Sequence, residues 1–240
     1  MARIFNGIRR RLLAEGKLSR YLSYALGEII LVVLGILIAL SINTWNHNQG
    51  LLQEEQEILT NLREEFNYNL KELERNQIKG QRFMTNADSL LAGFLDPTFV
   101  PDDAAFRRWM LRMTAYTSFD PSNGVVHDLI GSGKLHLIRN DALRIRLANW
   151  DGHVQDAKED ESRLMHSGDT YFVPIRFETV PVNSASRQQA HRDAFFGSLK
   201  NENVVTTLRG HMRYIVEENY AMLQHEIAGI LESLSSESQN

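Results

Sequence analysis

The sequence predicts a mainly α-helical protein: one N-terminal transmembrane helix, then an extracytoplasmic helical bundle with little or no β structure. The first observation is a run of 22 residues, Tyr24–Trp45, in which Glu28 is the only formal charge. About 20 such residues in a helix span roughly 30 Å of hydrocarbon. The second observation is that apolar residues recur at helical spacing through most of the remaining chain. The stretch richest in β-branched and aromatic residues, 170–182, contains two prolines, which limit any strand there to a sheet edge.

Composition narrows the class of protein. Hydrophobic residues make up 43% of the chain and charged residues 23%, as in ordinary folded proteins. Cysteine is absent, which excludes disulfides, thiol catalysis and zinc–thiolate sites. The bundle must therefore be held together by packing alone.

The charge distribution predicts the orientation in the membrane. Residues 1–20 carry six basic side chains and one acidic one, whereas residues 46–240 carry 20 basic and 28 acidic ones. A basic flank stays in the cytoplasm, so we expect the N-terminus inside and the rest of the chain beyond the cytoplasmic (inner) membrane. This pattern indicates membrane lipid as a partner and not nucleic acid. The expected interfacial anchors are Arg9, Arg10, Arg11, Tyr21, Tyr24 and Trp45.

Two alternatives concern this N-terminal region. Residues 1–20 fit either a basic amphipathic helix on anionic headgroups or a solvated tail that only fixes topology. Ala39-Leu40-Ser41 would suit a signal peptidase, but the long basic region and long apolar run favour an uncleaved anchor.

One face of the transmembrane helix, 21–45, predicts self-association. Small and polar positions recur every three or four residues on it: Glu28, Val32, Gly35, Ala39 and Asn43. Gly35 and Ala39 form a small-xxx-small motif, which lets two helices approach closely. We therefore expect a homo-oligomer, with Glu28 facing a partner helix or the headgroups. The alternative is an interfacial glutamate that only marks membrane depth.

Two blocks of sequence resemble a known family. The first is YLSYALGEIILVVLGILIALSINTWN, residues 21–46, and the second is SGKLHLIRNDALRIRLANW, residues 132–150. Together they resemble an uncharacterised bacterial family of single-pass membrane proteins with a domain of unknown function. The resemblance implies a basic N-terminus, one membrane helix, a mostly helical outer domain and no established activity. It supplies no functional residues.

Residues 46–235 are expected to form one helical domain, followed by a frayed tail, 236–240. After a polar break at 46–50, helices are expected at 51–79, 82–94, 102–114, 122–130, from 140 to about 166, and from about 204 to 234. Short links between them suggest an antiparallel bundle. A leucine-rich seam on the first helix fits either the core of this domain or an oligomer interface, although Glu55 and Asn69 interrupt it. Its members are Leu52, Leu59, Leu62, Phe66 and Leu73.

No motif predicts catalysis, and we expect no enzyme activity, no cofactor and no metal. GSGK at 131–134 lacks the spacing of a phosphate loop, and the eight histidines contain no pair at i, i+4. A helix end and tight turn is the better interpretation of the glycines. A loop site remains conceivable around them, from His127, Asp128, Ser132, Lys134 and His136.

The predicted function is therefore a membrane-anchored, self-associating helical protein that binds a partner protein or small ligand without catalysis. The first alternative is a sensor-like module that relays ligand binding through the transmembrane helix. The second is an extracytoplasmic hydrolase built on the loop site, in which Ser132, His127 and Asp128 would act as a triad.

Overall fold

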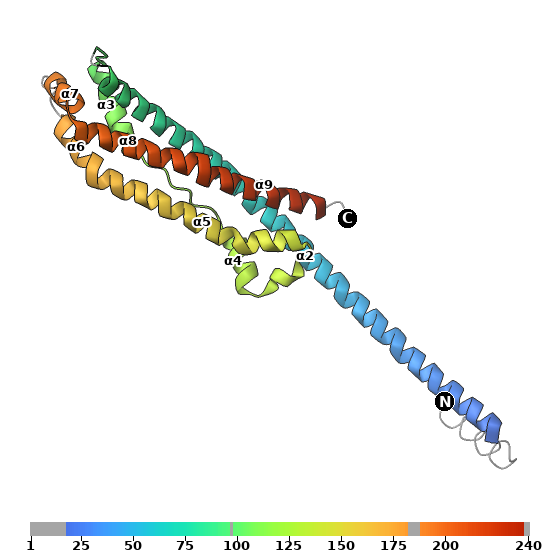
Figure 1. Cartoon of the computed structure of the whole chain (residues 1–240). Coiled ribbons are helices and arrows are strands. Elements are labelled where there is room, and N and C mark those ends of the chain that lie inside the picture. The colour runs from blue at the N-terminus through green and yellow to red at the C-terminus, as the bar shows by residue number, and fades with distance from the viewer. Residues whose placement is uncertain (1–17, 97, 182–187, 238–240) are drawn as a thin grey trace. The chain divides into compact units, whose positions relative to one another are not determined.

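The computed structural model describes residues 18–96, 98–181 and 188–237, which are helical or irregular with no strand among them (Figure 1). The mainly helical fold class predicted from the sequence is confirmed. The chain divides into two compact units, Met1–Glu55 and Gln56–Asn240. The predicted basic segment 1–20 falls almost wholly outside the described residues, including Arg9, Arg10 and Arg11.

The described part of the first unit belongs to helix α2, Leu18–Leu95. From residue 22 to residue 45 no side chain is buried, and leucine, isoleucine and valine are exposed on every side of the helix. The most apolar 18 residues of this helix have a mean hydropathy of 2.7, so the helix is long and apolar enough to cross a membrane. The predicted apolar N-terminal helix that could cross a membrane is therefore present.

The predicted breaks within this region are wrong. The sequence suggested a polar interruption at 46–50 and separate helices at 51–79 and 82–94, but α2 is assigned as helix throughout. A glycine inside a helix lowers its stability by only about 1 kcal/mol relative to alanine. This is too little to end a helix when the residues on both sides favour helix. Gly80 is needed for close packing, because a Cβ there would lie 2.5 Å from Cγ2 of Val216.

Three long helical segments form the second unit: residues 56–95 of α2, helix α5 (Asp141–Ser167), and the run α8 (Leu199–Tyr214), η4 (Ile215–Asn219) and α9 (Tyr220–Glu237). The run α8–α9 is antiparallel to α2, since Asp88 pairs with Arg209 at 2.7 Å and Gln77 with Gln224 at 3.0 Å. It is also antiparallel to α5, since Asp160 pairs with Asn219 at 2.9 Å and Arg146 with Glu226 at 2.7 Å.

Helices α2 and α5 run parallel, which corrects the expectation of a purely antiparallel bundle. The Phe66 ring lies 5.1 Å from that of Trp150, and further along both helices Tyr116 lies against Phe83 and Gly168. Parallel neighbours require the chain to return between them. Residues 115–123, here called the crossover segment, have neither helical nor strand assignment and make this return alongside α2.

The leucine-rich seam lies largely in the core of the second unit. Leu59, Leu62, Phe66 and Leu73 are all buried within the single chain, so they leave no surface for a second copy. Leu52 is partly buried and belongs to the first unit. Four of the five seam residues thus lie in the core of the second unit.

Short helices connect the long ones. Helix α3, Asp103–Arg112, begins after Asp102, whose carboxylate accepts from the Ala105 N–H, and Asn140 caps α5 by accepting from the Leu143 N–H. The predicted helices at 102–114 and from 140 thus begin where they were expected, each after a capping side chain. Helix α4, Gly124–Gly131, ends before Gly133, which has φ of +72° and leads into the single turn η1, Lys134–Leu137. The glycine turn is thus a helix end, as expected.

The edge strand conceivable at 170–182 is not formed among the described residues. The π-helical segment η2, Gly168–Phe172, continues α5 and leads into α6, Val173–Thr179, with Pro174 in its first turn. Proline has no N–H to donate, and the π-helical segment directly before it departs from the regular α-helical hydrogen-bond pattern. A further helix not predicted from the sequence, α7 (Gln188–Phe196), places the Phe195 ring 5.4 Å from that of Phe106.

A tight contact beneath η2 requires Gly168. A Cβ at this position would lie 1.9 Å from the hydroxyl oxygen of Tyr116. That hydroxyl is buried and makes no hydrogen bond among the described residues. Burial and the nearby Asp169 raise the pKa of Tyr116 to about 12, so its ring remains neutral at physiological pH.

Candidate functional site

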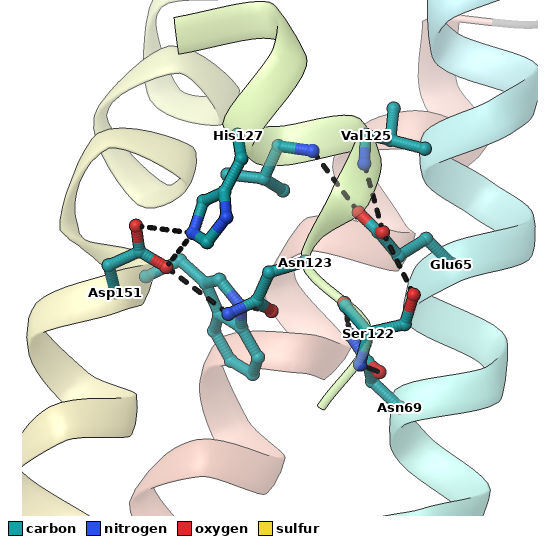
Figure 2. A network of polar contacts seen from close by, with 9 residues as sticks. Glu65, Asn69, Ser122, Asn123, Val125, His127 and Asp151 are labelled. Atoms are coloured by element: carbon teal, nitrogen blue, oxygen red, sulfur yellow. Dashed lines mark hydrogen bonds and ion pairs between the residues drawn. The ribbon is translucent and has the colours of Figure 1, made fainter. Parts of the chain in front are cut away.

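The crossover segment is held against α2 by polar side chains that interrupt the leucine-rich seam. Asn69 donates to the Ser122 carbonyl and accepts from the Ser122 N–H, both at 2.8 Å, as Figure 2 shows. Seven residues along the same face of α2, Asn76 accepts a hydrogen bond from the Thr117 hydroxyl. Irregular backbone must find partners when it is buried. The polar side chains in the seam therefore supply hydrogen-bond partners for the crossover segment.

Glu65 continues this face of α2 and serves as the N-terminal cap of α4. Its carboxylate accepts from the N–H groups of Val125 at 3.0 Å and Val126 at 3.2 Å, and from the Ser122 hydroxyl at 3.2 Å (Figure 2). The residue in the N-cap position, Asn123, makes no capping bond of its own. A carboxylate from a distant part of the chain thus replaces the local cap.

Glu161 of α5 holds the other side of the crossover segment. It is 1% exposed and accepts from the Ser118 hydroxyl at 2.7 Å, the Phe119 N–H at 2.9 Å and the Tyr220 hydroxyl at 2.6 Å. Burial, and next the charge of Glu161, raise the pKa of Tyr220 well above its ordinary value. Tyr220 therefore remains a neutral donor, and one carboxylate joins the crossover segment, α5 and α9.

We expect Glu65→Ala to lower the free energy of unfolding by about 2 kcal/mol, because it removes the cap of α4 and leaves buried N–H groups without an acceptor. The matched control is Glu64→Ala, an exposed position on the same helix, which should change stability by less than about 0.5 kcal/mol. Urea unfolding of the full-length protein in mild detergent, followed by circular dichroism, measures both. Equal losses for the two variants would contradict the capping role.

A polar cluster reaches the surface beside this cap. Nε2 of His127 lies 2.9 Å from Asp151, and the side-chain amide of Asn123 donates to the same carboxylate at 3.3 Å (Figure 2). The Asn123 oxygen accepts from the indole of buried Trp150 at 2.8 Å. His127 and Asp151 are 59% and 49% exposed, which places them where a partner can reach them.

The residues of the candidate loop site are only partly brought together. His127 pairs with Asp151 of α5 and not with the adjacent Asp128, and the Ser132 hydroxyl donates to the Leu129 carbonyl at 3.5 Å. His136 contacts the Gly133 carbonyl at 2.8 Å, and Lys134 lies in the same turn. The proposed triad of Ser132, His127 and Asp128 is therefore not the arrangement found.

The exposed imidazole and carboxylate of this site can form hydrogen bonds and charge interactions with another molecule. Within residues 18–96, 98–181 and 188–237, no three histidine, aspartate or glutamate side chains are placed to hold a metal ion. The segment 131–134 follows the C-terminus of α4, where carbonyls and a partial negative charge oppose phosphate binding. An imidazole–carboxylate pair beside a buried tryptophan instead suits a polar or charged group of a partner.

The membrane-helix positions all lie in the first unit. Glu28, Val32, Gly35, Ala39 and Asn43 are exposed along α2, and a Cβ on Gly35 would meet nothing within 4 Å. Tyr24 and Trp45 are exposed as well, while Tyr21 is helical but its side chain lies outside the described residues. The small-residue face is therefore open to another helix.

Sequence reasoning did not single out Glu65, Glu161 or Tyr220. Their partners lie roughly 40 to 60 residues away along the chain, and no local pattern encodes such distances. Asn69 did leave a signal, because an amide in an otherwise apolar seam needs a partner when buried.

Together these features define a helical protein with one apolar N-terminal helix long enough to cross a membrane. The family model of DUF6090, a family of unknown function, matches residues 28–172, more than half of the chain. The chain belongs to this family, in agreement with the two sequence blocks. The matched range contains most of the apolar segment, the whole crossover segment and the His127–Asp151 cluster. Neither a comparison with curated proteins nor one with solved structures finds a match.

Proposed function

We propose that this protein is an uncleaved single-pass protein of the cytoplasmic membrane whose extracytoplasmic helical unit binds a partner protein or small ligand without catalysing a reaction. The observation that carries the proposal is the apolar segment 22–45, none of which is buried within the chain. Exposed apolar area is unfavourable in water by about 25 cal/mol per Å². Lipid tails relieve this cost over the whole circumference of the helix.

Retention of the anchor is supported by the length of the N-terminal segments. The basic residues extend from position 3 to position 20 and the apolar run covers 24–45, whereas the apolar core of a signal peptide has about 7–15 residues. The orientation rests on the six basic side chains before the apolar segment.

Single cysteines test the orientation cleanly because the natural chain has none. Asn6→Cys would mark the N-terminal flank, and Gln155→Cys the exposed surface of α5. In intact spheroplasts, a membrane-impermeant maleimide should label Gln155→Cys, and Asn6→Cys only after lysis. Labelling of Asn6→Cys before lysis would overturn the proposed topology.

Self-association through the small-residue face is the expected assembly. Leucine in place of Gly35 and Ala39 would fill the small-residue face and keep the α2 helices of two copies from approaching closely. We expect the double variant Gly35→Leu, Ala39→Leu to lower the oligomer mass of the full-length protein in mild detergent, measured by native mass spectrometry. The control is Leu34→Gly, Ile38→Ala, which alters adjacent positions on another face. An unchanged mass in the first variant would remove this face from the interface.

One observation favours the sensor-like alternative. The membrane segment and the core positions Leu59–Leu73 belong to the same helix, α2, which is assigned without interruption. Ligand binding that changed the packing of these core positions would act on the helix that enters the membrane. The discriminating result is a ligand-dependent change in the oligomer or in labelling of Asn6→Cys, neither of which a passive anchor would show.

A further inference from the structure

A groove of about 580 Å³ lies between the η2 end of α5 and helix α8. This volume is within the range of small-molecule sites in proteins. Tyr171 of the π-helical segment η2 lines one side, and π-helical turns occur frequently at functional sites. The groove is lined by no residue of the His127–Asp151 cluster and is therefore a separate site.

The lining of the groove is mainly apolar. Leu208 is buried in the core and Val204 packs against it, and both present an edge to the groove. Tyr171 and Leu199 are 55% and 70% exposed. Single exposed apolar side chains are ordinary, but two on the walls of one apolar groove form a surface suited to a ligand.

Formal charge is confined to one end of the groove. Among the described residues, Lys200 is the only charged one that lines the groove, and it makes no ion pair with another of them. Its neighbour Glu202, in the same turn of α8, does not line the groove. From Leu199 to Leu208 the lining extends about 13 Å along the helix. The groove thus extends along α8 with a mainly apolar surface, to which Asn203 and Thr207 add polar groups, and it is cationic at one end.

These properties match a molecule with the complementary distribution, and we propose that the groove binds a long-chain fatty acid. Its carboxylate would pair with Lys200, and its alkyl chain would lie along α8 toward Thr207 and Leu208. The inference names the ligand class that the proposed function leaves open, and it rests on that function.

The test uses the full-length protein in lipid nanodiscs with a diazirine derivative of palmitic acid, irradiated and mapped by mass spectrometry. We expect crosslinks within 199–208 and 167–171 that unlabelled palmitate suppresses. Lys200→Glu replaces an attractive charge with a repulsive one and should lower this labelling about tenfold. Thr207→Trp should lower it similarly by filling the groove.

Matched controls separate the groove from general effects. Thr206→Trp places the same bulk on the preceding residue, which is exposed but does not line the groove, and Lys71→Glu reverses the charge of an exposed lysine of α2. Both should label as the unmodified chain does. Labelling confined to 22–45, labelling that palmitate does not suppress, or equal labelling in Thr207→Trp would each overturn the inference. The cysteine labelling experiment tests the topology separately. If the topology were wrong but the groove were still labelled, the proposed function would be refuted and the fatty-acid site would stand.

Discussion

Replacing Glu161 with alanine should lower the free energy of unfolding by about 3–4 kcal/mol. Three donors now converge on this carboxylate, and two of them, the Phe119 N–H and the Tyr220 hydroxyl, are buried. Each buried donor left without an acceptor costs about 1–3 kcal/mol. The substitution would also release the crossover segment from α5, so the loss should exceed that of an ordinary surface change.

Urea unfolding of the full-length protein in mild detergent measures this effect, with Glu159→Ala as the control. Glu159 is an exposed glutamate two residues earlier on α5, and its replacement should change stability by less than about 0.5 kcal/mol. Tyr220→Phe, which removes one donor and leaves the carboxylate, should cost only about 1 kcal/mol. If the unfolding free energy of Glu161→Ala lay within 1 kcal/mol of that of the unmodified protein, Glu161 would not hold the crossover segment, α5 and α9 together as described.

The raised pKa of Tyr220 predicts how the stability of the fold changes at alkaline pH. The folded protein raises the pKa of Tyr220 above the ordinary value of 10.0. A raised tyrosine pKa stabilises the fold fully below pH 10, and this contribution is lost as the pH rises further. Tyr220→Phe cannot ionise, so it should weaken the dependence of stability on pH above about 10.

Phe66→Ala should lower the free energy of unfolding by about 3–5 kcal/mol. The ring is fully buried, and it meets the edge of Trp150 at 5.1 Å between centroids and 69° between planes. Its removal would leave a cavity where α2 and α5 pack in parallel, and the aromatic contact would be lost as well.

Tyr68→Ala is the matched control, since Tyr68 lies two residues further along α2 and is 51% exposed. The comparison also separates the two interpretations of the leucine-rich seam. A core residue changes the unfolding free energy at every protein concentration, whereas an interface residue changes the concentration dependence of assembly. A Phe66→Ala protein of normal stability but reduced oligomer mass would contradict the core placement.

The parts of the fold that were predictable are those with local signals. The apolar face of α5, with Leu143, Leu147, Trp150 and Val154, was visible as helical periodicity, and all four are buried. The caps formed by Asp102 and Asn140 act on N–H groups three residues away. Such short-range effects can be inferred from neighbouring residues alone.

The errors arose where long-range packing decides the outcome. Gly50 and the polar residues around it suggested a break, but a glycine costs a helix only about 1 kcal/mol and the polar residues less, which is too little to end a helix that continues on both sides. The β-branched stretch 170–182 is mostly helical because Phe172, Ile175 and Val180 pack into the helical core. The return of the chain along α2 depends on Glu65, Asn69 and Asn76, whose partners are 41 to 61 residues distant.

The central claim is that the apolar segment remains as a membrane anchor, and the intact mass of the protein extracted from membranes tests it most directly. Native mass spectrometry in mild detergent should give a fixed multiple of a 27.5 kDa chain that still contains residues 1–40. Release of subunits in the gas phase would give the chain mass itself. A chain that begins near Ile42 would show that GEIILVVLGILIAL is a cleaved export signal, and would contradict the account.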